Sequence, residues 1–264
     1  RFVSAGDSRA GTTKIRANID RLAGLDADFW LFNGDMTEVG SQGEWDVWLD
    51  AMRPVLDRRP MLVVQGNHEI FADLFYYQWA LPRMEDLSPD LVEHAWSFNY
   101  GNVHFVGLDS NTEEMAMAQS AWLDRDLAKA AADPDITWKV VMFHHPAYSA
   151  SPKHGSTDRV MAHFVPAFER HGVDIAFSGH DHDYERTYPI HTNQITDDGH
   201  GVTYVVVGGF FSPGYSNGYD WWTVTSADGD KHNYAVIDVD GRTMTVVSYS
   251  GDGAEELDRF VLRK

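Results

Sequence analysis

The chain of 264 residues contains no cysteine. Disulfide bonds and thiolate metal sites are therefore excluded, and any bound metal must use nitrogen and oxygen ligands. Basic residues are also scarce, with 21 lysines and arginines against 40 acidic residues, for a net charge of −19. Such a surface repels nucleic acid phosphates and anionic membranes, so we expect neither a nucleic acid polymer nor a membrane as a partner. No apolar run approaches the length that spans a bilayer.

The first half of the sequence alternates apolar runs with amphipathic stretches, which predicts a mostly parallel sheet covered by helices. A hydrophobic content of 43% is typical of a globular protein with a substantial core. We expect strands at 2–5, 29–32 and 61–64, and helices at 13–22 and 44–52.

The rest of the chain departs from this rhythm, since Gly101-Asn102 predicts a hairpin and the residues after Gly179 form mainly apolar runs. We expect helices at 117–131 and 157–170, and strands at 97–100, 103–108, 138–143, 173–177, 203–207, 232–239, 243–249 and 257–262. The predicted fold is α/β (α+β), a four-layer αββα sandwich of two mixed β-sheets flanked by helices. We expect residues 1–264 to form a single catalytic domain.

Five short polar clusters each follow an apolar run. They are Gly6-Asp7, Gly34-Asp35, Gly66-Asn67-His68-Glu69, His144-His145 and Gly179-His180-Asp181-His182. Ligand sites of α/β sheets collect beyond the carboxyl ends of strands, so these clusters meet on one rim if their strands are neighbours. Taken singly, each aspartate could be a turn residue or a helix cap. The ordered set favours a site instead, and the glycines would let the backbone turn sharply beside a bound ion.

Carboxylates, an amide oxygen and imidazoles suit two divalent or trivalent cations. A carboxylate shared by two cations lowers their mutual repulsion, and we assign this bridging role to Asp35. Two cations about 3.5–4 Å apart lower the pKa of a water between them and hold a phosphoryl group. This ligand set suits Zn, Mn or Fe better than Mg or Ca. We therefore expect two metal ions per chain, with Fe, Zn or Mn preferred.

The order of the clusters resembles the calcineurin-like metallophosphoesterase family, and within it the purple-acid-phosphatase-like branch. The resemblance covers nearly the whole chain from Asp7 onward. It rests on Gly6-Asp7, Gly34-Asp35, Gly66-Asn67-His68-Glu69, Ser97-Phe98-Asn99-Tyr100-Gly101-Asn102-Val103-His104-Phe105, His144-His145-Pro146 and Gly179-His180-Asp181-His182-Asp183-Tyr184-Glu185-Arg186.

The resemblance implies a hydrolase that cleaves phosphomonoesters by in-line attack of a metal-bound hydroxide. It implies that His68 faces the phosphate and assists the leaving group, and that Asn67 and His154 contact the substrate. The implied ligands of one metal are Asp7, Asp35 and His182, and those of the other are Asp35, Asn67, His144 and His180.

Two positions depart from the family pattern. Purple members carry a tyrosine three residues after the second aspartate, where this chain has Glu38, so we expect no tyrosinate ligand and no purple colour. Many other members carry a histidine two residues after the first aspartate, where this chain has Arg9. Arg9 could instead hold a phosphate oxygen of the substrate, since guanidinium matches that geometry.

Three further questions stay open at the level of sequence. The alternatives to a phosphomonoesterase are a phosphodiesterase for small cyclic or nucleotide diesters and a non-catalytic phosphate-binding protein that retains the metal ligands. The expected partner is a small phosphorylated substrate, with no prediction of oligomeric state. The acidic composition and the start at Arg1 rather than Met favour a secreted or periplasmic processed protein, with a cytoplasmic one not excluded and residues before Arg1 unknown.

Overall fold

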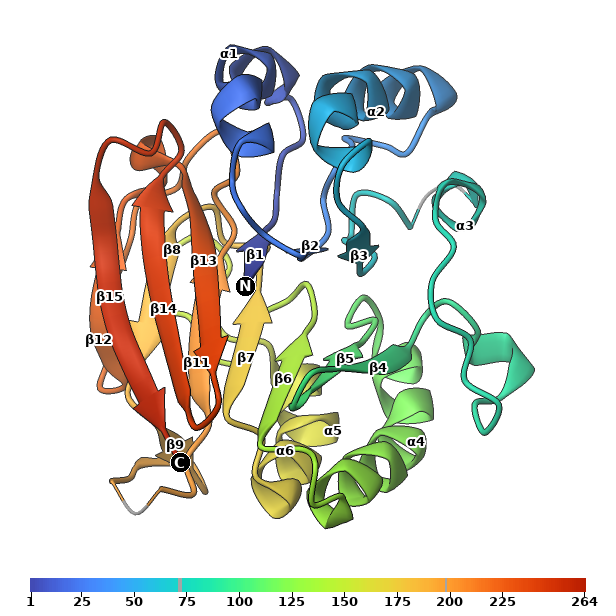
Figure 1. The fold of residues 1–264 in the computed structure, drawn as a ribbon, viewed down its shortest axis with the longest axis vertical. Coiled ribbons are helices and arrows are strands. Elements are labelled where there is room, and N and C mark those ends of the chain that lie inside the picture. The colour runs from blue at the N-terminus through green and yellow to red at the C-terminus, as the bar shows by residue number, and fades with distance from the viewer. Residues whose placement is uncertain (71–72, 198) are drawn as a thin grey trace.

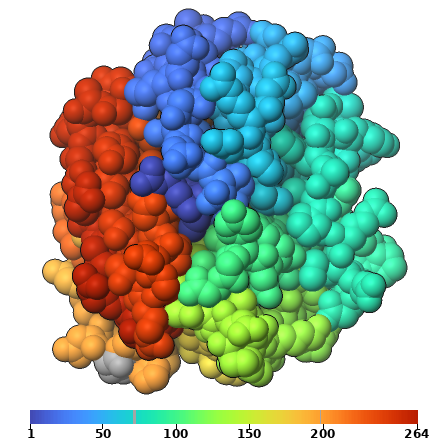
Figure 2. All heavy atoms as spheres, in the orientation of Figure 1, coloured from blue at the N-terminus to red at the C-terminus, as the bar shows by residue number. Residues whose placement is uncertain are grey.

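The computed structural model describes residues 1–70, 73–197 and 199–264. Within these residues one sheet has six strands in the order β15-β14-β13-β1-β2-β3, and β1, β2 and β3 run parallel. The strands of this first sheet are β1 (Phe2–Ala5), β2 (Phe29–Phe32), β3 (Met61–Val63), β13 (Asn233–Asp240), β14 (Thr243–Ser250) and β15 (Glu256–Arg263). The C-terminal strands therefore pack beside the N-terminal one, and Figure 2 shows the red C-terminal segment against the blue N-terminal residues.

The second sheet has the order β12-β8-β11-β7-β6-β5-β4, in which β5, β6, β7 and β11 run parallel. Its strands are β4 (Trp96–Tyr100), β5 (Val103–Gly107), β6 (Trp138–Met142), β7 (Ile175–Ser178), β8 (Tyr184–Thr187), β11 (Thr203–Val207) and β12 (Thr223–Ala227). A separate two-stranded ribbon joins β9 (Ile190–His191) and β10 (Gln194–Ile195). The predicted hairpin is present, because β4 and β5 pair antiparallel on either side of Gly101-Asn102.

Helices lie on the outer faces of the two sheets (Figure 1). The helices α1 (Thr12–Ala23) and α2 (Gln42–Leu56) cover the first sheet, while α4 (Glu113–Ala132), α5 (Asp158–His163) and α6 (Val165–His171) cover the second. A short helix, α3 (Leu74–Gln78), and two 3-10 turns, Pro89–Leu91 and Gly229–Lys231, lie in the connections. This arrangement confirms the predicted αββα sandwich of two mixed sheets.

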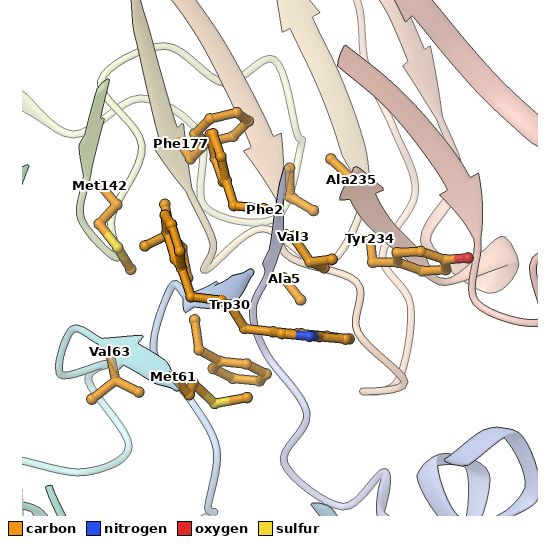
Figure 3. Close-up of a cluster of buried hydrophobic side chains, with 14 of the residues drawn as sticks. Phe2, Val3, Ala5, Trp30, Met61, Val63, Met142, Phe177, Tyr234 and Ala235 are labelled. Atoms are coloured by element: carbon orange, nitrogen blue, oxygen red, sulfur yellow. The ribbon is translucent and has the colours of Figure 1, made fainter. Parts of the chain in front are cut away.

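Aromatic side chains fill the space between the sheets (Figure 3). Phe2 of the first sheet meets Phe105 and Phe177 of the second edge to face, with ring centroids 5.1 and 6.4 Å apart. Alternate residues of β2 point to opposite faces, so Phe29 packs on Phe105 while Phe32 packs on Trp48 of α2. Both faces of β2 are therefore buried.

Two expectations about single elements are wrong. The helix expected at 157–170 is divided into α5 and α6 at Phe164, because Pro166 has no N–H and its ring clashes with the preceding turn. The strands β8 and β12 were not expected. Among the described residues, no helix is long and apolar enough to cross a membrane.

Candidate metal centre

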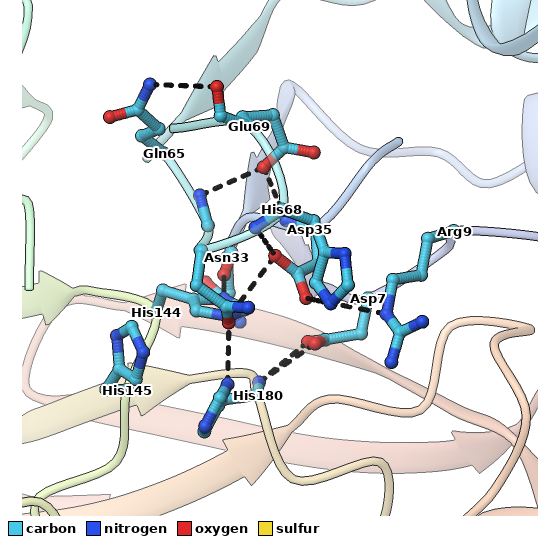
Figure 4. Close-up of polar contacts among 12 residues, drawn as sticks. Asp7, Arg9, Asn33, Asp35, Gln65, His68, Glu69, His144, His145 and His180 are labelled. Carbon is cyan, nitrogen blue, oxygen red and sulfur yellow. Dashed lines mark hydrogen bonds and ion pairs between the residues drawn. The ribbon is translucent and has the colours of Figure 1, made fainter. Parts of the chain in front are cut away.

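The polar clusters meet where parallel strands of both sheets end (Figure 4). In the first sheet, Asp7, Asp35 and Asn67 follow β1, β2 and β3. In the second sheet, His144 follows β6 and His180 follows β7. The structure thus brings together side chains from five loops at the rim where the two sheets face each other.

The first two loops are joined through their backbones. The N–H of Asp7 donates to the carbonyl of Gly34 at 2.9 Å. The N–H groups of Ser8 and Arg9 both donate to the carbonyl of Asp35, at 2.8 and 3.1 Å. These bonds fix the separation of the two aspartates before any cation binds.

Three of the predicted ligand residues adopt the left-handed backbone conformation. The φ angles are 62° at Asp7, 55° at Asp35 and 71° at His180, a conformation that costs about 1–2 kcal/mol for a residue with a side chain. The neighbouring glycines serve close approach, because a Cβ at Gly66 would collide with the carboxylate of Asp35 and one at Gly179 with that of Asp7. The sharp turn that we expected of the glycines is therefore made largely by the ligands.

One group of ligand atoms comes from Asp7, Asp35 and His182, and these atoms all lie within 4.8 Å of one another. The Nδ1–H of His182 donates to the carbonyl of Pro213 at 2.6 Å, which leaves a lone pair on Nε2. That Nε2 lies 3.4 Å from Asp7 Oδ1. Burial raises the pKa of both carboxyl groups and lowers the pKa of His182 to about 4.

A second group surrounds Nε2 of His144. Its Nδ1–H donates to the carbonyl of Asn33 at 2.7 Å, so Nε2 carries a lone pair. Facing this lone pair are Asn67 Oδ1 at 3.0 Å, His180 Nδ1 at 3.2 Å and Asp35 Oδ1 at 3.3 Å. One proton on His180 or Asp35 satisfies only one of these approaches, whereas a cation among the four atoms satisfies all of them.

The donor atoms fit two cations that share Asp35. Donors about 2.1 Å from one cation are themselves about 3.0–3.4 Å apart, which matches the spacing around His144. Burial lowers the pKa of His144 to about 3 and also lowers the pKa of His180, so both imidazoles stay neutral, the form that binds metals. A bound cation would also supply positive charge next to the buried carboxylates of Asp7 and Asp35. Nitrogen and oxygen donors of this kind suit Zn, Mn or Fe.

The predicted catalytic histidine lies at the edge of this cluster. The Nδ1–H of His68 donates to the carbonyl of Glu38 at 2.6 Å, and its Nε2 lies 3.9 Å from Asp35 Oδ2. The side chain of His68 is 22% exposed and lies beside the carboxylate of Asp35, the predicted bridging ligand. Because Nδ1–H donates to the carbonyl of Glu38, Nε2 is the nitrogen that is left to face the cluster.

Arg9 occupies the place where the family pattern would put a histidine ligand. Its Nη1 donates to both carboxylate oxygens of Glu38, at 2.9 and 3.1 Å, and its Nη2 donates to the hydroxyl of Tyr215 at 3.1 Å. Its Nε lies 3.6 Å from Asp35 Oδ2. Both departures from the family pattern, Arg9 and Glu38, therefore contact each other. A phosphate contact by Arg9 stays a prediction: Nη1 and Nη2 already donate to Glu38 and Tyr215, whereas the buried Nε has no hydrogen-bond partner among the described residues.

The two remaining histidines of interest also lie against the cluster. The ring of His154 is 4.3 Å from that of His180 and 5.5 Å from that of Tyr215, centroid to centroid. The ring of His145 is also 4.3 Å from that of His180, and one ring nitrogen each of His144, His145 and His180 lie within 4.8 Å of one another. Strand alternation predicted that only one of His144 and His145 reaches the rim. That argument does not apply, because β6 ends at Met142, before both histidines.

For two residues of the site, Glu69 and Tyr215, the sequence predicted no functional role. The buried carboxylate of Glu69 accepts from the N–H groups of Asp35, Thr37 and Gly66 at 2.8–3.0 Å, and so joins two ligand loops. The signal for Glu69 in the sequence is its position directly after His68.

Tyr215 stacks on His182 with ring centroids 4.0 Å apart and an interplanar angle of 7°. Only its position in an aromatic-rich loop pointed to it.

Comparison with known families and proteins agrees with this geometry. Residues 1–184 match the family model described as calcineurin-like phosphoesterase. Purple acid phosphatases 18 and 21 of Arabidopsis thaliana are 32% and 31% identical over 220 and 219 residues, which is 78% of this chain. The aligned parts make up 48% and 49% of those proteins, so the chain spans about half the length of the curated relatives it matches.

Solved structures resemble the fold. Purple acid phosphatase PPD1 from yellow lupin (Lupinus luteus) seeds matches 99% of this chain and 53% of its own, with a TM-score of 0.77 and 19% identity. GAP50, the anchor in the inner membrane complex of Plasmodium, matches 99% of this chain and 88% of its own, with a TM-score of 0.70 and 15% identity. Together with the sequence relatives, these matches confirm the resemblance to the purple-acid-phosphatase-like branch and support a metal-dependent phosphoesterase. The chain belongs to the calcineurin-like phosphoesterase family.

Proposed function

We propose that this protein hydrolyses phosphomonoesters at a centre of two metal ions. The observation that carries the proposal is the convergence of Asn67 Oδ1, His180 Nδ1 and Asp35 Oδ1 on the lone pair of His144 Nε2. Beside it stand two buried carboxyl groups whose pKa burial raises. Such a set of groups is costly to bury unless a cation binds them.

The residues divide between the two ions through one shared carboxylate. Asp7, Asp35 and His182 would hold one ion, and Asp35, Asn67, His144 and His180 would hold the other. Such a pair, when bound, lowers the pKa of a water and draws charge from the phosphoryl oxygens. Iron, zinc and manganese fit the nitrogen and oxygen donors. No tyrosine stands at the position of Glu38, so a ferric centre here would lack the purple band of a tyrosinate ligand.

His68 is the proposed proton donor to the leaving alkoxide. Its Nδ1–H is fixed on the carbonyl of Glu38, so the imidazolium presents Nε2–H toward the cluster. Asn67 presents its Oδ1 to His144, which leaves its amide N–H groups to donate to a phosphoryl oxygen. His154, whose ring centroid lies 4.3 Å from that of His180, is placed to contact the rest of the ester. Together these donors would orient the phosphoryl group and compensate the charge of the transition state.

The test uses metal content and two aryl substrates. Purified protein is stripped, reloaded with Fe, Zn or Mn, analysed for bound metal, and offered 4-nitrophenyl phosphate and bis(4-nitrophenyl) phosphate. We expect two metal ions per chain and faster hydrolysis of the monoester. Hydrolysis of the diester alone would replace the phosphatase by a phosphodiesterase.

The variant His68→Ala separates catalysis from metal binding. We expect kcat for the monoester to fall about 10²–10⁴-fold, because general acid catalysis contributes that much, while metal content stays at two ions. His191→Ala, in the β9 ribbon away from the centre, is the matched control and should keep full activity. Equal rates in His68→Ala and wild type would remove His68 from the mechanism. Metal binding without hydrolysis of either ester in wild type would favour a non-catalytic phosphate-binding protein.

A further inference from the structure

A cavity of about 560 Å³ opens beside the second group of ligand atoms. It shares His180 with that group, and His145 and His154 also lie on its wall. The remaining wall is built by Glu113 and by the segment from Lys153 to Arg159, which carries two cationic side chains. A substrate whose phosphoryl group reaches the metal centre therefore has this cavity next to it.

The two cations in the cavity wall are not neutralised by carboxylates. Among the described residues, neither Lys153 nor Arg159 takes part in an ion pair. The ammonium of Lys153 lies 5.7 Å from the ring centroid of Tyr215, and its side chain is exposed. The guanidinium of Arg159 is partly buried and donates from Nε to the carbonyl of Ser110 at 2.6 Å. That bond turns one edge of the guanidinium to the protein and leaves the Nη groups without a protein acceptor in the described part of the chain.

The acidic residues around the cavity do not cancel these charges. Glu113 accepts a hydrogen bond from His163 Nε2 at 2.6 Å, and 62% of its side chain is exposed. Asp158 is exposed at the start of α5. Burial lowers the pKa of Arg159, and this effect is larger than the opposing attraction of the guanidinium by Glu113 and Asp109. A cation in that state gains more from an anionic ligand than an exposed cation does.

We propose that this cavity binds a second anionic group of the substrate through Lys153 and Arg159. The inference rests on the proposed function and narrows its substrate class to phosphate esters whose alcohol part carries another phosphate, sulfonate or carboxylate. The guanidinium offers a planar, two-donor edge to such a group, and the ammonium adds a mobile point charge. In a chain of net charge −19, these two cations also direct an anionic substrate to this side of the centre.

The test uses ligands that differ by one sulfonate, a group that binds metals poorly. Calorimetry compares the Kd of propylphosphonate and 3-phosphonopropane-1-sulfonate for the metal-loaded protein, and two- and four-carbon homologues test the reach. Phosphate release from propyl phosphate and 3-sulfopropyl phosphate is measured in parallel. We expect the sulfonate to tighten binding about fivefold to tenfold at the best chain length, as charge-assisted hydrogen bonds do.

Variants identify the residues that give this preference. Lys153→Met and Arg159→Met should each reduce the sulfonate preference to about twofold or less, while Arg125→Met, which removes an arginine of α4 without an ion pair in the described chain, should retain it. Lys153 donates no side-chain hydrogen bond in the described residues, so Lys153→Met remains decisive if Arg159→Met folds poorly.

The outcomes separate this inference from the proposed function. Equal affinity of wild type for both phosphonates, with propyl phosphate hydrolysed, would overturn the second anion site and leave the phosphatase intact. A sulfonate preference retained in Lys153→Met and Arg159→Met would also overturn it. Failure of wild type to bind either phosphonate or to hydrolyse either ester would overturn the proposed function, and this inference with it.

Discussion

At the residue scale, Glu69 holds the loops of the candidate site in place through hydrogen bonds to their backbones. Its two carboxylate oxygens accept from three backbone N–H groups and from the hydroxyl of Thr37. Burial raises the pKa of Glu69, and these bonds favour the charged form. The residue therefore resembles the supports of metal ligands, whose loss commonly costs about 10–100-fold in metal affinity.

The variant Glu69→Gln should weaken both stability and metal binding. Glutamine places an NH₂ group against backbone donors, so we expect a loss of about 1–3 kcal/mol in the free energy of unfolding in urea. We also expect about 10–100-fold weaker metal binding by competition with a chelator. Glu85→Gln, at an exposed position, is the control. Unchanged metal affinity in Glu69→Gln would show that the loops hold their positions without it.

Asp183 gives the chain a pH dependence of its own. It is fully buried, and neither carboxylate oxygen has a hydrogen-bond partner among the described residues. Burial, followed by repulsion from Asp181, raises its pKa to about 8. A carboxyl with a raised folded-state pKa contributes its full stability below the unfolded value of about 3.9 and loses it as pH rises to about 8.

Asp183→Asn should therefore be more stable than wild type at pH 9 and flatten the decline between pH 4 and 8. We expect a gain of at least about 1 kcal/mol at pH 9, since each unit of pKa shift corresponds to about 1.4 kcal/mol. Urea unfolding of chelator-treated and metal-loaded protein at pH 5, 7 and 9 measures it, with exposed Asp135→Asn as the control. A variant with the same pH slope as wild type would contradict this assignment.

At the scale of elements, β8 and β15 are joined across the two sheets. The carboxylate of Asp258 in β15 accepts from the hydroxyl of Tyr184 and from two nitrogens of Arg186, both in β8. The guanidinium of Arg186 also lies over the ring of Phe260, 4.4 Å from its centroid. These contacts fix the strand that begins two residues after His182.

Asp258→Asn should destabilise the protein by about 2 kcal/mol, because it removes one partner of a largely buried ion pair. Thermal and urea unfolding measure the loss, and Asp135→Asn again serves as the control. Metal content should stay at wild-type level, because Asp258 is outside both groups of ligand atoms. A loss of metal in Asp258→Asn would mean that β8 positions His182 more strongly than its own hydrogen bond to Pro213 does.

Elements with a strong periodic pattern were predictable, and those defined by tertiary contacts were not. The strands that lead to Asp7 and Asp35 are fully buried and mainly apolar, with Ser4 the one polar residue, and their predicted bounds agree with the structure. The strand β8 could not be predicted, because Tyr184 and Arg186 continue the polar segment that begins at Gly179 and pair with β11 only through tertiary contacts. The strand β12 consists of half-buried residues with no alternation to detect.

In the candidate site, too, features set by the sequence pattern were predictable and those set by tertiary contacts were not. Strand ends and ligand chemistry were enough to predict that Asp35 and His144 lie together, and the structure brings them within 3.3 Å. The contact of Arg9 with Glu38 and Tyr215 could not be predicted, since it depends on the conformations of two loops far apart in sequence. The roles of the individual residues, and a single domain over 1–264, stay predictions.

At the scale of the whole molecule, metal removal should lower stability in a pH-dependent way. The buried carboxyl groups of Asp7 and Asp35 have raised pKa values, so without cations their contribution to stability falls as pH rises above about 4. His144 and His182 have lowered pKa values, so their protonation opposes metal binding only in acid. Both effects make bound cations more stabilising at higher pH.

We therefore expect the melting temperature of metal-loaded protein to exceed that of chelator-treated protein, with a difference that grows from pH 4 to pH 8. Free metal at 100 times its Kd adds about 2.7 kcal/mol to the free energy of unfolding. Calorimetry at fixed ionic strength measures the difference, and magnesium, which suits these donors poorly, is the control cation. A difference that is constant across this range would contradict the assignment of the buried carboxyl groups as ligands.

Asp35 follows a strand of the first sheet and His144 a strand of the second, and they are 109 positions apart in the chain. A cation bound to both would join the two halves of the sandwich as a reversible cross-link. Separation of the sheets would then have to await release of the ion, so loading should slow unfolding far more than it speeds folding. The reaction centre would thus also set the kinetic lifetime of the native protein.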